Sequence, residues 1–299
     1  EIEYATGGAD TWWGAERARD GHAEPFPLHY VEIGNEDWFD KSGSYDGRFA
    51  QYFRAIKKRY PNLQLIATTP VKSVKPDVLD EHFYMPAEQS MGDAGHYDKT
   101  DRNGPKIFVG EWATREGEPT PNLQAALGDA AWMTGMERNS DLIVMASYAP
   151  LFVNVNPGGM QWTSDLIGYD ALSSYGSPSY WAQVLFGSYL GTEVVPATLT
   201  DAGPRMFTSV TRDEKLRKLF VKVVNASSET VPLTIALSGV EKVQPEAKLV
   251  TLSGKTPNAT NTIANPEAIV PVEQKITVDG PKFNQSFAPY SINVLVIGF

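Results

Sequence analysis

The chain has 299 residues, with 26 basic residues, 36 acidic residues and a net charge of −10. This length can bury a sizeable core and predicts two domains. The negative charge argues against a nucleic-acid partner and against an anionic membrane surface, and it suits a neutral substrate such as a sugar. Cysteine is absent, which excludes a disulfide framework, a thiolate metal site and a cysteine nucleophile.

No segment approaches the roughly 18 apolar residues that a membrane helix needs. The chain opens with Glu1-Ile2-Glu3-Tyr4, without methionine and without a signal peptide. This opening predicts that an upstream part is missing. The residues leave the compartment undetermined, with an extracellular or periplasmic location slightly favoured over the cytoplasm.

After 28 polar residues, strands and helices alternate along the first two thirds of the chain. We expect five strands, near residues 30, 65, 82, 109 and 144. We expect helices at 48–60, 75–79, 122–139 and 179–189, a loop or helix at 87–100, and a Gly- and Asn-rich loop up to about residue 165. Such alternation is typical of βα units that form a parallel sheet. An eight-stranded barrel would lack its first three strands here.

The character of the chain changes after about residue 192, because all seven Trp and all four His lie before that point. The remainder has short alternating runs at 218–224, 231–237, 248–252, 275–278 and 291–297. This pattern predicts an antiparallel β-sandwich or jelly roll. We therefore expect an α/β catalytic domain over 1–191, an incomplete (β/α)8 barrel, and an all-β domain over 192–299.

Two stretches have the same form: an apolar run, then glycine, then glutamate. Glu36 follows Gly34-Asn35 at the end of the strand near residue 30, and Glu111 follows Gly110 in the strand near residue 109. Polar residues at the carboxyl ends of barrel strands are where barrel enzymes keep their chemistry. Two carboxylates delivered by two strand ends are what glycoside hydrolysis requires. A capping or salt-bridging carboxylate is the ordinary alternative for Glu36, whereas Glu111 stands in an apolar run where an unpaired charge is costly.

Other side chains are candidates for binding the substrate. Asn35 is placed to hydrogen-bond a sugar hydroxyl. His82 and Tyr84 are two apart and share one strand face, either as part of a site or as a satisfied core pair. Trp112 and Trp162, like Trp38, either line a sugar site or pack in the core.

The sequence predicts no metal site and no organic cofactor. Asp93, His96 and Asp98 match no standard zinc or calcium spacing and are interpreted as a solvated loop. Pro157-Gly158-Gly159 lacks the lysine of a phosphate-binding loop. No nucleophile elbow supports Ser-His-Asp catalysis.

Most of the chain resembles the α-L-arabinofuranosidases of glycoside hydrolase family 51. The resemblance is most specific over residues 12–40 and 107–190, and Gly-Asn-Glu by itself is shared with many clan A glycosidases. The matching motifs are Trp13-Gly14, Arg17-Ala18, Asp20-Gly21-His22, Glu24-Pro25-Phe26, Tyr30 to Trp38, His82-Phe83-Tyr84 and Gly110-Glu111-Trp112-Ala113.

The resemblance implies a retaining mechanism with Glu36 as the acid/base on barrel strand 4 and Glu111 as the nucleophile on strand 7. It implies that Asn35 holds the sugar 2-hydroxyl and that Tyr84 lies close to the nucleophile. Where the family uses a glutamine after strand 8, Asp165 is the nearest match. The implied substrate is an arabinose-containing polysaccharide or oligosaccharide.

Two other functions remain open from the residues. One is a different clan A retaining glycosidase, such as a β-xylosidase or an endoglucanase. The other is a carbohydrate-binding fragment in which the β-rich domain binds sugar and the half-barrel is inert. The open strand edges of a half-barrel also predict association, for example as a homo-oligomer.

Overall fold

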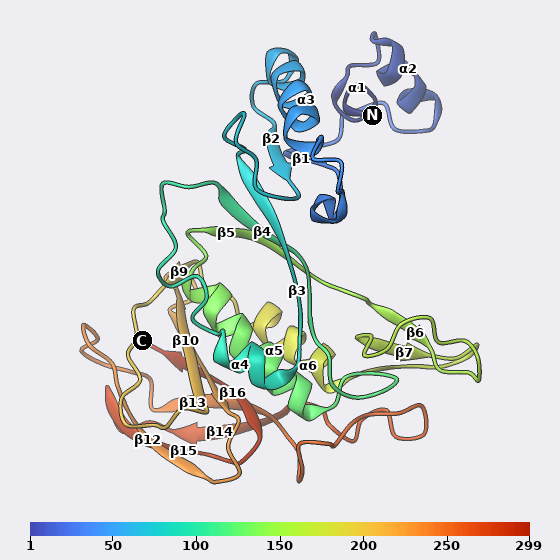
Figure 1. Ribbon diagram of the computed structural model, residues 1–299. Coiled ribbons are helices and arrows are strands. Elements are labelled where there is room, and N and C mark those ends of the chain that lie inside the picture. Colours follow the sequence, from blue (N-terminus) through green and yellow to red (C-terminus); the bar gives the residue numbers. More distant parts are fainter. The chain divides into compact units, whose positions relative to one another are not determined.

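The computed structural model describes residues 1–299 and divides into two compact units (Figure 1). The first unit is Glu1–Glu81 with Asp101–Gly110, and the second is His82–Thr100 with Glu111–Phe299. One five-stranded sheet has the order β1-β2-β3-β4-β5. Its strands are β1 (Tyr30–Ile33), β2 (Gln64–Ala67), β3 (Val78–Met85), β4 (Lys106–Thr114) and β5 (Ile143–Tyr148). The five expected strand positions are confirmed, and β1, β2 and β3 pair in parallel.

The first unit packs one amphipathic helix, α3 (Tyr45–Arg59), beside β1 and β2 (Figure 1). Phe49 of α3 is fully buried against Leu65 of β2. Of the basic residues in the last turn, Lys58 and Arg59 are exposed and Lys57 pairs with Asp77, and Pro61 follows the end of the helix. The expected helix at 48–60 is thus confirmed, because its apolar residues recur at the helical period.

Two short helices, α1 (Ile2–Thr6) and α2 (Trp12–Arg19), lie in the N-terminal stretch for which we expected no elements. They are held together by Arg17, whose side chain is fully buried. Its guanidinium donates to the carbonyl oxygens of Tyr4, His22 and Ala23 at 2.6–2.9 Å. These bonds to backbone carbonyl oxygens have no periodic signal in the sequence.

The second unit contains α4 (Ala87–Gly92), α5 (Leu123–Arg138) and α6 (Pro178–Ser188). Asn122 and Ser177 cap α5 and α6 by accepting backbone N–H bonds. Both expected helices are therefore confirmed. The expected helix at 75–79 is wrong, because β3 already begins at Val78.

An antiparallel domain follows α6. Its six-stranded sheet has the order β14-β13-β16-β11-β10-β9, and β12 pairs with β15 in a second sheet. The bounds are β9 (Glu193–Val194), β10 (Met206–Asp213), β11 (Lys218–Asn225), β12 (Val231–Ala236), β13 (Glu246–Ser253), β14 (Val272–Thr277), β15 (Lys282–Phe287) and β16 (Ser291–Gly298). The five expected runs each overlap one strand, and two of them extend one residue beyond it, whereas β9, β10 and β15 were not expected. A shared apolar core, which includes Phe283 and Leu295, joins the two sheets.

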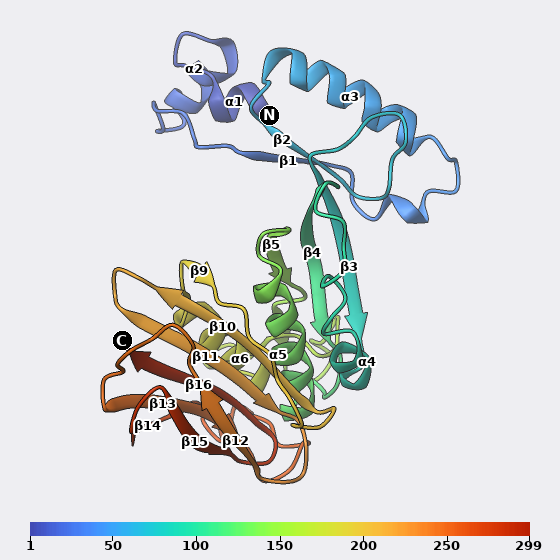
Figure 2. The ribbon, with the colours of Figure 1, turned by 90° about the vertical axis from the view of Figure 1, so that its left-hand side faces the viewer.

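A buried lysine ties α5 to the antiparallel sheet, which the helices α5 and α6 cover on one face (Figure 2). Lys222 of β11 is fully buried, and its Nζ lies 2.5 Å from Oε1 of Glu137 and 2.8 Å from the carbonyl oxygen of Tyr189. Burial lowers the pKa of Lys222, and the charge of Glu137 opposes that effect. The lysine charge is thus accommodated only because its partners are in place.

The stretch expected to be a Gly- and Asn-rich loop contains β6 (Phe152–Asn154), and two further short strands follow it. With β7 (Ile167–Tyr169) and β8 (Ser174–Gly176) it forms a three-stranded sheet in the order β6-β7-β8. We call residues 149–177, which carry this sheet, the arm. Three-residue strands leave too short an alternating pattern to be recognised in the sequence.

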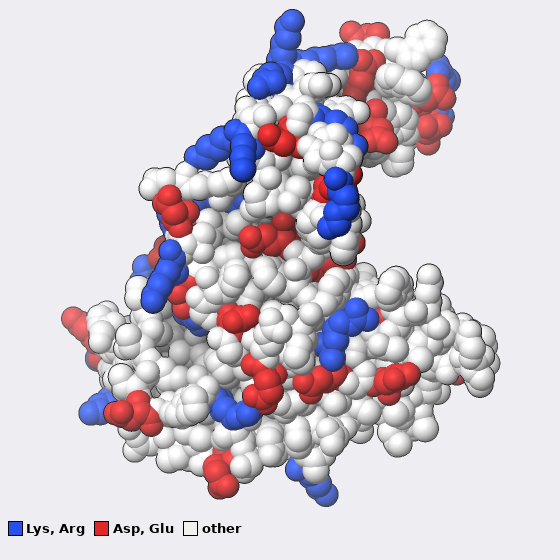
Figure 3. All heavy atoms as spheres, in the orientation of Figure 1, with Lys and Arg blue, Asp and Glu red and all other residues white.

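Acidic and basic side chains are interspersed over much of the face in Figure 3, and basic atoms gather over α3. None of the helices combines the length and the apolar character needed to span a bilayer.

Candidate active site

Glu36 lies in a tightly constrained turn directly after β1, in the first unit. Its φ is 52°, a left-handed conformation that is uncommon for residues other than glycine. Gly34 has a φ of 111°, and a Cβ there would lie 1.9 Å from Oδ2 of Asp37. That oxygen accepts the backbone N–H of Asn35 and the hydroxyl of Thr68. The turn therefore requires Gly34 and is held by Asp37, and it stores backbone strain at Glu36, as functional sites often do.

A second glycine fixes the backbone before Glu111. A Cβ on Gly110 would lie 2.1 Å from Oδ1 of Asp80, and this oxygen accepts the N–H of Gly110 at 2.9 Å. Asp80 is 3% exposed. The close approach of β3 to β4 thus explains why glycine stands next to the glutamate.

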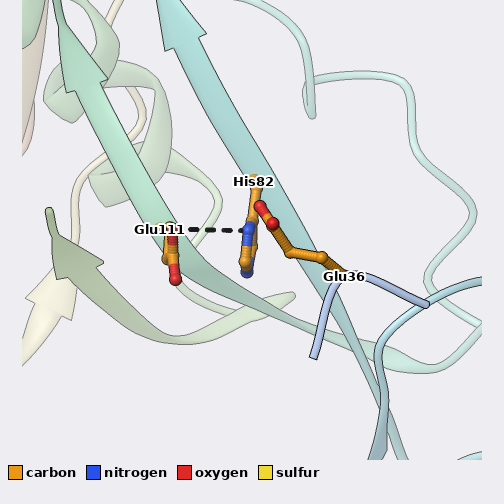
Figure 4. Close-up of side chains that lie close together, drawn as sticks. All are labelled: Glu36, His82 and Glu111. Atoms are coloured by element: carbon orange, nitrogen blue, oxygen red, sulfur yellow. Dashed lines mark ion pairs between the residues drawn. The ribbon is translucent and has the colours of Figure 1, made fainter. Parts of the chain in front are cut away.

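Tyr84 and His82, both on β3, lie beside the carboxylate of Glu111 on β4. Figure 4 shows His82 next to Glu111. The Tyr84 hydroxyl donates to Oε2 of Glu111 at 2.5 Å. Nδ1 of His82 lies 3.6 Å from the same oxygen, as the dashed line in Figure 4 marks. The contacts of Oε2 orient the carboxylate, and a hydrogen bond to an ionised carboxylate is among the stronger kinds.

Arg115 connects this carboxylate to the arm. Its guanidinium carbon lies 5.2 Å from the centre of the Tyr84 ring, a cation–π arrangement. One of its nitrogens donates to the carbonyl oxygen of Thr163 at 3.0 Å. A chain of contacts therefore runs from Glu111 through Tyr84 and Arg115 to the backbone of the arm.

A layer of buried polar groups lies around the end of β4. Asp129 of α5 is fully buried, and its Oδ1 accepts the N–H of Thr114 at 2.8 Å. Burial raises the pKa of Asp129 to about 7, and the hydrogen bond from the Thr114 N–H opposes the shift only in part. Burial also raises the pKa of the Tyr148 hydroxyl. It raises the pKa of Asp165 as well, although the charge of Arg115 acts to lower that pKa. The layer thus favours uncharged side chains around this strand end.

The side chains predicted to form the site differ in their placement. Tyr84, His82 and Glu111 are brought together, and the shared face of His82 and Tyr84 was anticipated from their spacing. Trp112 is 3% exposed and packs edge-on against Tyr148, with ring centroids 5.3 Å apart.

The remaining candidates lie on turns or in the arm. Trp162 is 57% exposed on the arm, and Asp165 is buried in the arm. Asn35 is exposed in the turn that carries Glu36.

Sequence reasoning missed three residues that organise these surroundings: Asp37, Asp80 and Arg115. Asp37 immediately follows Glu36, and Arg115 follows the strand of Glu111 by one residue. Their closeness to the motifs was a usable signal. Asp80 had none, because its role depends on a neighbouring strand 30 residues away in the chain.

The combination of a parallel sheet, two glutamates that each follow a glycine at a strand of that sheet, and a tyrosine held against one carboxylate is typical of glycoside hydrolases. The model of the α-L-arabinofuranosidase C-terminal domain matches residues 97–291, and the model of the α-L-arabinofuranosidase 1 domain matches residues 1–102. The chain belongs to the α-L-arabinofuranosidase family.

Curated relatives support this assignment. Alpha-L-arabinofuranosidase 2 of Arabidopsis thaliana is 37% identical over 280 residues, which cover 91% of this chain and 41% of the relative. Alpha-L-arabinofuranosidase A of Aspergillus kawachii is 34% identical, over 99% of this chain and 47% of the relative. The chain thus spans less than half the length of these two relatives.

Solved structures give the same result. An arabinose-bound α-L-arabinofuranosidase of glycoside hydrolase family 51 superposes with a TM-score of 0.92 at 37% identity, covering 99% of this chain and 49% of that one. The α-L-arabinofuranosidase of Thermotoga maritima, in complex with arabinose, has a TM-score of 0.81 at 21% identity, over 100% of this chain and 72% of that one. The latter similarity shows the fold alone.

Proposed function

We propose that this chain carries the catalytic carboxylates of a retaining glycoside hydrolase that releases terminal, non-reducing α-L-arabinofuranosyl residues from arabinose-containing polysaccharides or oligosaccharides. The observation that carries the proposal is the hydrogen bond from Tyr84 of β3 to Glu111 of β4, in a chain of the α-L-arabinofuranosidase family. An aryl or sugar glycoside of arabinofuranose is the corresponding substrate class.

In this proposal Glu111 is the nucleophile. The Tyr84 hydroxyl holds Oε2, which leaves the other carboxylate oxygen to attack the anomeric carbon as the bond to the leaving group breaks. The product of this step is a covalent arabinosyl-enzyme. His82, 3.6 Å from Oε2 on the same side of the sheet, would help to orient the carboxylate and the sugar.

Glu36 is the acid/base. It gives its proton to the departing glycosidic oxygen, then takes a proton from the water that attacks the arabinosyl-enzyme, so that it ends in its starting state. Asn35 would hold the 2-hydroxyl of the sugar, and such bonds strengthen in the oxocarbenium-like transition state. The strained conformation of Glu36 supports a functional role for this turn.

The finer architecture is also part of the proposal. Strands β1–β5 would be strands 4–8 of a (β/α)8 barrel, residues 1–191 the catalytic domain, and residues 192–299 a β-sandwich or jelly roll. Trp112, Trp162 and Asp165 would contribute to the sugar site. Strand order β1-β2-β3-β4-β5 supports the barrel assignment, because consecutive strands are neighbours in such a barrel.

The test uses the complete product of the gene that encodes this chain, assayed with 4-nitrophenyl α-L-arabinofuranoside. Glu111→Ala should abolish turnover, whereas Glu88→Gln, an exposed carboxylate paired with Arg205, should not affect it. Added azide should restore cleavage by Glu111→Ala and yield an arabinosyl azide of inverted configuration, because the azide attacks from the side that the carboxylate vacates.

A folded gene product that hydrolyses an aryl xyloside or glucoside instead would refute the arabinofuranosidase assignment and favour another clan A glycosidase. A folded product that binds sugar, cleaves no aryl glycoside and is indifferent to Glu111→Ala would point to a binding protein.

A further inference from the structure

The arm, residues 149–177, carries little charge. It contains two acidic residues, Asp165 and Asp170, and no Lys, Arg, Glu or His. Asp165 is buried, and Asp170 accepts the backbone N–H groups of Leu172 and Ser173 within its own turn. The surface over β6 and β7 is accordingly almost free of coloured atoms in Figure 3. In a chain of net charge −10 this is an unusual distribution.

The sheet of the arm has one buried face and one exposed face. In its register Val153, Gly168 and Tyr175 lie side by side, and Val153 and Tyr175 are buried. A Cβ on Gly168 would lie 2.4 Å from the Tyr175 ring, so this face is closely packed. Because strand residues alternate between faces, the neighbouring positions form the opposite face. The second face of the arm is therefore the one that is exposed to solvent.

Aromatic side chains stand on the exposed face. Phe152 is 62% exposed and Tyr169 is 38% exposed, and their rings lie 6.5 Å apart at 79° to one another. Further exposed apolar side chains follow in the connecting turns, namely Met160, Trp162 and Leu172. Exposed amides and hydroxyls such as Asn156 and Gln161 lie between them. Large exposed apolar groups gathered in this way mark binding surfaces.

The arm is physically connected to the nucleophile proposed above. Arg115 donates to the carbonyl oxygen of Thr163, next to Trp162, and lies over the ring of Tyr84, which holds Glu111. All these residues belong to the second unit. A polymer bound to the arm would thus lie close to the carboxylate that acts on its branches.

We propose that the exposed face of the arm binds the neutral main chain of a polysaccharide whose arabinosyl branches are cleaved at Glu111. The inference rests on the proposed function and extends it to the leaving-group side of the substrate. Aromatic rings offer flat apolar surface to the C–H faces of sugars, and uncharged amides and hydroxyls pair with sugar hydroxyls. The absence of basic groups disfavours an acidic polymer, and the absence of exposed carboxylates other than that of Asp170 disfavours a basic protein partner.

The experiment measures retardation of the 299-residue chain in native gels that contain soluble arabinoxylan or arabinan, each used intact and after removal of its arabinosyl branches. The wild-type chain should be retarded by an intact polymer and by its debranched form, and not by polygalacturonate. The double variant Phe152→Ala/Tyr169→Ala should bind about tenfold more weakly (about 1.4 kcal/mol). Tyr52→Ala is the matched control, because Tyr52 is an aromatic residue that is 58% exposed on α3 and does not belong to the arm.

Several results would overturn the inference: no retardation by either neutral polymer, equal retardation of wild type and double variant, or loss of retardation on debranching. Sedimentation velocity tests the alternative that a second copy of the chain covers this face. If the double substitution converts a dimer into a monomer, the face binds a second copy of the chain and the inference is wrong. Because these readouts need no turnover, they are separable from the hydrolysis assay. Arabinofuranoside cleavage without polymer binding refutes this inference alone, and absence of cleavage by the gene product refutes the proposed function.

Discussion

Replacing Asp129 by asparagine tests whether a neutral carboxyl group underlies the strand end that carries Glu111. Asp129 is fully buried, and its pKa is raised from 3.8 to about 7 by that burial. A shift of roughly three units corresponds to about 4 kcal/mol of differential stability. Because the folded pKa lies above the unfolded one, this stability is fully present below about pH 4 and is lost as the pH rises through about 7.

Asparagine keeps the acceptor that binds the Thr114 N–H and removes the titration. We therefore expect the free energy of unfolding of Asp129→Asn, relative to wild type, to rise by roughly 2.5 kcal/mol between pH 5 and pH 8. Urea unfolding followed by tryptophan fluorescence at several pH values gives this difference, and the other titrating groups cancel in it.

The matched control is Asp170→Asn. Hydrogen bonds from the backbone N–H groups of Leu172 and Ser173 lower the pKa of Asp170. The stability that these bonds contribute is therefore fully present at any pH above the unfolded pKa of the aspartate. It is lost only as the pH falls through the lower, folded pKa. The control difference should be flat from pH 5 to pH 8. A difference for Asp129→Asn that is also flat within about 0.5 kcal/mol, or that falls with pH, would refute the reasoning.

Three further substitutions test other parts of the structure. Lys222→Met leaves the carboxylate of Glu137 buried without its cation and should lower the free energy of unfolding in urea by about 3–5 kcal/mol. The double variant Lys222→Met/Glu137→Leu should lose less stability, and equal losses would contradict this reasoning. Tyr84→Phe removes the bond to Glu111 and should lower kcat/KM of the gene product by about 10- to 150-fold, about 1.5–3 kcal/mol, whereas a change below about threefold would show the bond to be unimportant. Arg17→Met leaves several backbone carbonyls without a donor and should speed proteolysis within the first 28 residues at least tenfold; an unchanged rate would argue against that role.

Local patterns in the sequence predicted the elements whose signals are periodic. The helix that contains Phe49 was found because its apolar residues repeat at the helical period, and the helix before Asn139 because it is rich in Ala, Leu and Met. Strand β10 was missed although it is eight residues long, because Thr208, Ser209 and Thr211 interrupt its apolar character. These side chains are buried or bonded by neighbouring strands, which a single run of residues does not reveal.

Some features of the candidate site were likewise predicted from the sequence and others were not. The sequence located Glu36 and Glu111 through their glycines and placed His82 and Tyr84 on one face of a strand. It did not reveal that Tyr84 donates to Glu111, that Arg115 stacks on Tyr84, or that Asp80 requires Gly110. Each of these contacts joins two segments that are distant in the chain or depends on the register between two strands.

For this protein the sequence alone determined the alternation of strands and helices, the change to antiparallel strands after residue 192, and the two glutamates at strand ends, because periodicity and turn chemistry act over a few neighbouring residues. Only the tertiary structure decided that Arg17 and Lys222 are buried, that burial raises the pKa of Asp129, and that the sparsely charged stretch after Ala149 folds into an arm with an exposed aromatic face. Burial and pairing depend on groups brought together from remote parts of the chain, and their energies exist only once the chain has folded.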